Sequence, residues 1–178
     1  MEPTRSTAAS GHAQRPQRTY RTGAVTRWIR IATVVLTGAA IVAALLRYPA
    51  LPDSVPTHFG VTGEPDAWGP PSSVFPLLAI LAALVGGMTW LSFHPRYFNF
   101  PVEVTEDTAQ PMYRLGEQMI VWVTACCALM CIGIICEIMF PVSMMPLTVV
   151  GTAGLFGGIA VSLVRMFRLK PAATPTEA

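Results

Sequence analysis

The sequence predicts an all-α membrane protein with four transmembrane helices and a structured, Pro/Gly-rich extracytoplasmic loop between helices 1 and 2. Three observations lead to this fold class. Hydrophobic residues make up 52% of the 178 residues and charged residues only 12%, about half the charged fraction of an ordinary soluble domain. Four apolar runs are each suited to crossing a bilayer, and the basic residues are distributed very unevenly between the segments that join them.

The four apolar runs lack the period-two alternation of barrel strands, so each is predicted to be a helix. The first needs its flanking interfacial aromatics, Trp28 and Tyr48, to reach the roughly 20 residues that cross a bilayer core. The runs cover residues 31–46, 74–93, 119–140 and 147–164.

The predicted membrane domain spans residues 28–170 and contains the loop 48–73. Residues 1–27 are polar and arginine-rich, so we expect a disordered cytoplasmic tail, retained rather than cleaved as a signal peptide. Residues 171–178 are expected to form a short disordered tail. Arginine in place of lysine, with abundant Ala, Gly and Pro, suggests a bacterial source.

The basic residues predict the orientation of the chain. Four spans place both termini on one side, which receives eleven of the twelve Lys and Arg residues, while the other side receives only Arg47. Because basic segments stay in the cytoplasm, the termini and the 94–118 loop are predicted to be cytoplasmic. The expected location is a multi-pass position in the bacterial cell membrane, with the loop 48–73 outside.

Rows of small residues predict where helices approach closely. Whether these rows pack within one chain or between two is left open, and the oligomeric state is not predicted. The rows are Ala79, Ala83 and Gly87 in the second run, and Gly154, Gly158 and Ser162 in the fourth.

The loop 48–73 is the most distinctive stretch, because its six prolines favour tight turns and extended segments over helix. We interpret it as a recognition surface; the alternative is a well-folded connector whose polar groups satisfy one another. The candidate binding residues are His58, Phe59, Glu64, Asp66 and Trp68, and the residues expected to set the loop geometry are Pro56, Gly60, Gly63, Pro65 and Gly69.

The loop also carries a motif: proline, any residue, histidine and an aromatic, then glycine and a proline–aspartate pair. The motif residues are Pro56, His58, Phe59, Gly63, Pro65 and Asp66, followed by Trp68 and Gly69. The motif resembles an uncharacterised bacterial membrane domain, a domain of unknown function that also occurs at the N-terminus of SdpI-type immunity proteins. Residues 99–113 resemble the loop after the second helix in these proteins. Relatives often continue with a small residue and a lysine, where this chain has Pro70 and Pro71. The resemblance implies a membrane protein of this domain family and does not establish immunity.

Two further features concern ionisable residues. Arg47 and Glu137 are predicted to lie at similar depth near the outer surface and to form an ion pair; the alternative is that each reaches interfacial water separately. Thr105 is predicted to cap a helix that has Glu106 and Asp107 in its first turn. Pro111 predicts a kink in that helix or a later start.

Catalysis is not expected, because the sequence has no nucleophile motif, phosphate-binding glycine loop or intramembrane carboxylate pair. The net charge of +2 argues against nucleic acid as a partner. No metal or other cofactor is expected, since His58 and His94 are separated by a whole transmembrane helix. The cysteines, which share one apolar run, are interpreted as packing residues; they are Cys126, Cys127, Cys131 and Cys136.

The leading functional hypothesis is a non-enzymatic recognition, accessory or immunity-like protein that acts through the loop 48–73. Its partners would be the lipid bilayer and a peptide or protein at that loop. One alternative is a signalling protein that relays to a cytoplasmic regulator through the 94–118 loop, which otherwise reads as a solvated juxtamembrane helix. The other is a small transporter or metal-handling protein.

Overall fold

The structure, a computed structural model, describes residues 15–60, 62–140 and 142–169. It contains four helices that are long and apolar enough to cross a membrane, and one small antiparallel sheet, which confirms the predicted fold class. The helices are α1 (Ala24–Arg47), α2 (Val74–Ser92), α3 (Glu106–Met139) and α4 (Met145–Phe167), and the strands are β1 (Val55–Phe59) and β2 (Pro65–Gly69).

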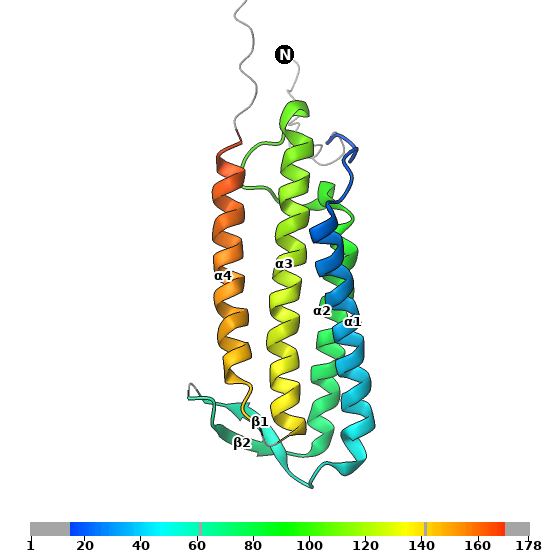
Figure 1. Cartoon of the computed structure of the whole chain (residues 1–178), viewed down its shortest axis with the longest axis vertical. Helices are drawn as coiled ribbons and strands as arrows, with labels where there is room; N and C mark the ends of the chain where they lie inside the picture. The colour runs from blue at the N-terminus through cyan, green and yellow to red at the C-terminus, as the bar shows by residue number, and fades with distance from the viewer. Residues whose placement is uncertain (1–14, 61, 141, 170–178) are drawn as a thin grey trace, which may run out of the picture.

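The four helices run lengthwise side by side, and α3 is the helix that all the others contact (Figure 1). α1 and α2 pack against one side of α3, whereas α4 packs against another part of it. The β-hairpin lies across one end of this bundle, which we call the hairpin end (Figure 1). The opposite end, where residues 15–23 lie, is called the strap end. The apolar core lies toward the hairpin end and includes Ala44, Val74, Leu78, Leu81, Val85, Ala128, Ile135 and Met139.

α3 begins where the sequence places its cap. The Thr105 hydroxyl accepts from the Thr108 backbone N–H, and the Thr108 hydroxyl accepts in return from Thr105 N. The helix continues through Pro111, so the later start is not observed. At 34 residues it is about 50 Å long. This exceeds the roughly 30 Å of a bilayer core, so α3 extends beyond the apolar run at the strap end.

Residues 15–23 differ from the expected disordered tail, and α1 already begins at Ala24. They form a segment without helix or strand that bends at Tyr20 and is held along α3, and we call it the strap. The physical reason is a set of hydrogen bonds to α3 side chains, including one from the Tyr20 hydroxyl to Glu117. The rest of the predicted N-terminal tail, residues 1–14, and the predicted tail 171–178 lie outside the described residues.

The two small-residue rows have different surroundings. On α4, an added Cβ at Gly158 would lie 2.1 Å from Cδ1 of Trp122, and the Trp122 indole N–H donates to Gly154 O at 2.7 Å. This row therefore packs against α3 within one chain. On α2, Ala79 and Ala83 are exposed, and an added Cβ at Gly87 would meet nothing within 4 Å.

The orientation of the bundle is a prediction that reporter fusions can check. A reporter active only in the cytoplasm should work when fused after Lys170 or within the 94–118 loop, because eleven of the twelve basic residues lie on that side. It should fail when inserted beside Gly63. The opposite pattern of activity would contradict the charge argument.

Candidate functional site

The loop 48–73 folds into a hairpin that is fixed at its base. Val55 pairs with Gly69 and is fully buried, and Phe59 pairs with Pro65 at the far end. In the connection, Gly60 N donates to Glu64 O at 2.9 Å and Gly63 N donates to Gly60 O at 2.9 Å. The expected turns and extended segments are thus two paired strands, with an irregular register around His58.

Gly63 has a backbone conformation that other residues resist. Its φ is +83°, in the left-handed region that favours glycine. An added Cβ there would lie 2.9 Å from Sδ of Met145, at the start of α4. Gly63 therefore allows the tip of the hairpin to approach α4 closely.

A Gly63→Val substitution should therefore reduce the amount of folded protein, because it combines backbone strain with a steric clash. The expected loss is about 1–3 kcal/mol of unfolding free energy. Gly38→Val is the matched control, since an added Cβ at that exposed position on α1 meets nothing within 4 Å. Folded yield and thermal unfolding in detergent would measure both. Equal behaviour of the two variants would contradict this role for Gly63.

A cleft of about 870 Å³ lies between the hairpin, α3 and α4. Its volume falls within the roughly 300–1,000 Å³ of ligand-binding clefts, which combine an apolar lining with a few polar groups. We call it the large cleft. Its lining includes His58 and Phe59 from β1, Glu137 from α3, and Thr148 and Ala153 from α4.

A smaller cleft of about 250 Å³ lies beside it and shares Phe59, Gly63 and Glu137 with the large one. Glu64 and Trp68 line only this smaller cleft. Four of the five candidate binding residues of the hairpin are therefore divided between two adjacent clefts, and Glu137 lines both.

Asp66 lines neither cleft but contacts His58. Nδ1 of His58 lies 2.5 Å from Oδ1 of Asp66, and both side chains are more than half exposed. An interaction at this exposure contributes little to stability. It does fix the direction of the imidazole at the edge of the large cleft. Pro56 and Pro65 line the smaller cleft, whereas Gly60 and Gly69 leave room for Asp66 and Thr57 respectively.

The structure corrects the predicted pairing of Arg47 with Glu137. Within the described residues no ion pair joins them. Instead Oε1 of Glu137 accepts from Met144 N at 2.5 Å and from the Ser143 hydroxyl at 3.3 Å. The Arg47 guanidinium lies 5.4 Å from the centre of the Phe140 ring. The short α3–α4 turn brings backbone and hydroxyl donors to the carboxylate from nearby in the chain.

A second polar cluster, at the strap end, was not predicted from the sequence. Glu117, which lies in the predicted cytoplasmic loop 94–118, is 1% exposed and forms an ion pair with Arg30, which is 8% exposed. The Arg30 guanidinium also lies 4.0 Å from the centre of the Phe93 ring. Buried ionisable residues of membrane helices are rare and usually paired. A helical-period row of polar residues on α1 was the available signal: Thr26, Arg30, Thr33 and Thr37 are all buried.

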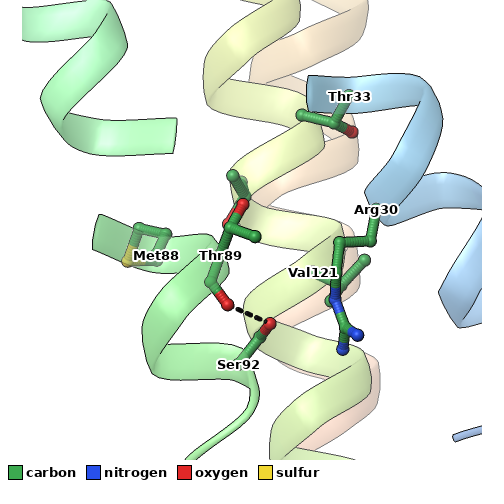
Figure 2. A pocket seen from close by; sticks show the side chains of 7 residues that line it. Arg30, Thr33, Met88, Thr89, Ser92 and Val121 are labelled. Atoms are coloured by element: carbon green, nitrogen blue, oxygen red, sulfur yellow. Dashed lines mark hydrogen bonds between the residues drawn. The ribbon is translucent and has the colours of Figure 1, made fainter. Parts of the chain in front are cut away.

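Arg30 and several hydroxyl side chains line a narrow space between α1, α2 and α3, which we call the polar seam (Figure 2). The space is too narrow to admit a water molecule. The Thr33 and Ser92 hydroxyls donate to carbonyls of their own helices. In the part of the chain that the structure describes, Nε of Arg30 and Oγ1 of Thr37 are buried without hydrogen-bond partners.

Tyr20 contributes a neutral hydroxyl to this end of the bundle. Partial burial and its hydrogen bond to the Glu117 carboxylate raise the pKa of the Tyr20 phenol above its ordinary value near 10. Tyr20 therefore remains a hydrogen-bond donor at physiological pH.

The four cysteines of α3 are free thiols. No group of three or more His, Cys, Asp or Glu residues that could hold a metal ion occurs in the described ranges.

These features define a four-helix membrane protein with a hairpin-bounded cleft at one end and a buried ion pair at the other. Residues 35–83 match a family described as a domain of unknown function (DUF1648). The chain thus carries the predicted kind of domain, and the match contains the whole hairpin and parts of α1 and α2.

One relative is an uncharacterized protein of Archaeoglobus fulgidus, 38% identical over 65 residues. The similarity covers 32% of this chain and 36% of the relative, so it spans only about a third of that protein's length. No solved structure matches the chain.

Proposed function

We propose that this membrane protein is a recognition protein without catalytic activity of its own, and that its large cleft binds a cationic amphipathic ligand such as a peptide. The observation that carries the proposal is the shape and chemistry of the cleft. An apolar lining from two membrane helices meets a carboxylate and a hairpin at one end. Such a surface is complementary to a molecule with an apolar body and a positive end.

The depth of the cleft supports an amphipathic ligand. Its lining on α4 extends from Met145 to Ala153, about 12 Å along the helix. Val149 and Ala153 are exposed on this wall. Because α4 is a membrane-crossing candidate, the deeper part of the cleft lies beside the acyl chains, where an apolar group is favoured.

The charges at the hairpin end support a cationic ligand. Four carboxylates occur there, on Asp53, Glu64, Asp66 and Glu137, against the single arginine Arg47. A surface with this excess of one sign attracts ligands of the opposite sign. Glu137 is the carboxylate shared by both clefts and is the best placed to hold a positive group. The resemblance to SdpI-type immunity proteins supports an immunity-like role, in which a harmful peptide is held at this surface.

Binding of a synthetic amphipathic peptide of lysine and leucine to the protein in nanodiscs tests this proposal. Glu137→Gln should weaken binding about tenfold, since it removes the negative charge proposed to hold the positive group of the ligand. Asp53→Asn is the control, because Asp53 carries the same charge at the same end but does not line either cleft. Empty nanodiscs measure adsorption to lipid. Equal affinities of the two variants would overturn the proposal.

The hairpin should matter beyond folding if it recognises the ligand. His58→Ala and Asp66→Asn are expected to leave membrane insertion and expression near normal, because both side chains are largely exposed. Each should nevertheless abolish the cellular phenotype of the gene. His58→Ala removes the imidazole, and Asp66→Asn removes the carboxylate that orients it. The phenotype is assayed at matched expression. Full activity of both variants would favour a purely structural connector.

Signalling to a cytoplasmic regulator is a second candidate function, and one observation favours it. The single uninterrupted helix α3 carries Glu137 at the large cleft and Glu117 at the strap. A ligand that shifts α3 therefore has a direct mechanical route to the strap end. Hydrogen exchange of residues 15–23 with and without the lysine–leucine peptide would distinguish signalling, which changes their protection, from recognition alone.

A further inference from the structure

Burial alternates along the strap. Arg18, Tyr20 and Thr22 are partly buried, whereas the residues between them are exposed. The chain bends at Tyr20, and the three partly buried side chains all turn toward α3. All three reach Glu117: the Tyr20 and Thr22 hydroxyls donate to its carboxylate at 2.7 Å each, and Arg18 Nη2 lies 3.3 Å from it.

The strap backbone is also recognised, by two side chains of α3. Gln110 accepts from Thr19 N at 2.9 Å and donates to Gln17 O at 2.8 Å, so one amide side chain pairs with both polar groups of the strap backbone. The Tyr113 hydroxyl donates to Pro16 O at 3.1 Å. Main-chain hydrogen bonds combined with contacts to alternate side chains are the means by which proteins bind extended peptides.

Docking of the strap is connected to the polar seam through Glu117. The carboxylate contacts strap residues and also pairs with Arg30, which lines the seam. Ser92, the last residue of α2, lines the strap end of the seam and is fully buried (Figure 2). When the strap is docked, the carboxylate is 1% exposed. Without the strap it would lose three of its four partners, and water would replace them at the mouth of the seam.

We propose that the strap-end face of α3 is a peptide-docking surface, formed by Gln110, Tyr113 and Glu117, and that residues 15–23 are its detachable occupant. When docked, the strap covers the mouth of the polar seam at Glu117 and Arg30; when detached, it exposes that mouth to water. This detachable contact lies at the opposite end of the bundle from the large cleft, and the proposal does not depend on ligand binding there.

Thiol labelling of the full chain tests whether the docked strap covers this mouth. In a background with the four native cysteines replaced by alanine, Ser92→Cys introduces one buried thiol. A polar maleimide should label it slowly in nanodiscs. The added pair Tyr20→Phe and Thr22→Val, which removes two hydrogen bonds from outside the membrane spans, should raise the labelling rate about tenfold or more. Arg21→Gln, at an exposed strap position, should leave the rate unchanged.

A synthetic peptide of residues 15–23 then tests whether the strap is detachable. Added in excess to the Tyr20→Phe, Thr22→Val chain, it should restore slow labelling, because the docking surface on α3 is intact. The same peptide carrying both substitutions should not restore it, and neither should the native peptide when the chain carries Glu117→Gln. Fast labelling with the native strap, protection that survives the strap substitutions, or failure of the native peptide to restore protection would each overturn the proposal.

Discussion

Replacing Glu117 with alanine is expected to lower the free energy of unfolding by about 3–5 kcal/mol, the usual cost of removing one partner of a buried ion pair. The reason is that Arg30, at 8% exposure, would remain buried without its counter-charge. The strap hydroxyls of Tyr20 and Thr22 would lose their acceptor as well. Thermal or denaturant unfolding in detergent micelles measures the loss.

Two further variants show whether the loss of stability comes from the unpaired charge of Arg30. Glu106→Ala removes an exposed carboxylate from the start of the same helix and should change stability little. The double substitution Arg30→Met with Glu117→Leu should recover much of the loss, because replacing both charges with apolar groups leaves neither one unpaired. Glu117→Ala unfolding at the same point as Glu106→Ala would contradict the structural role of the pair.

A Gly158→Leu substitution is expected to separate α4 from α3. Even a Cβ at this position would lie 2.1 Å from the Trp122 ring, which its hydrogen bond to Gly154 O holds in place. Overpacking of this kind costs about 1–3 kcal/mol or more. Because α4 packs mainly on α3, the loss should appear as a smaller fraction of folded, monodisperse protein in size-exclusion chromatography.

The neighbouring glycine supplies the control. Gly157→Leu places the same side chain on α4 where an added Cβ meets nothing within 4 Å, so it should be tolerated. Adding Trp122→Ala to Gly158→Leu should recover part of the loss, because it removes the group with which the leucine clashes. Strictly additive losses in this double-mutant cycle would show that the two positions do not interact.

The sequence was sufficient for the helices because each is determined by local properties. Run length and apolar content identified all four, and Thr105 marked the start of α3 thirteen residues before its apolar run. The hairpin was predicted only as turns and extended segments. Its pairing depends on which residues face each other across the turn, and the irregular register around His58 weakens any simple alternation in the sequence.

The sequence predicted the hairpin residues of the candidate site but not the residues deeper in the large cleft. His58 and Phe59 do line the large cleft, whereas the wall formed by α4 depends on how that helix packs. The contacts that the sequence did not predict are mainly those between residues far apart in the chain. Arg30 and Glu117 are 87 positions apart, and no local pattern joins them. The pairing of Arg47 with Glu137 was predicted only from their similar depth in the membrane. That depth does not show that the Met144 backbone N–H lies beside the Glu137 carboxylate.

Filling the large cleft tests most directly whether it is a binding site. Ala153 and Ala160 lie seven residues apart on nearly the same face of α4, and both are exposed, but only Ala153 lines the cleft. Affinity for the lysine–leucine peptide is measured in nanodiscs for Ala153→Trp and Ala160→Trp, each checked for folding by thermal unfolding. We expect a loss of affinity of about tenfold or more for Ala153→Trp and unchanged affinity for Ala160→Trp. Unchanged affinity in a well-folded Ala153→Trp protein would contradict this expectation.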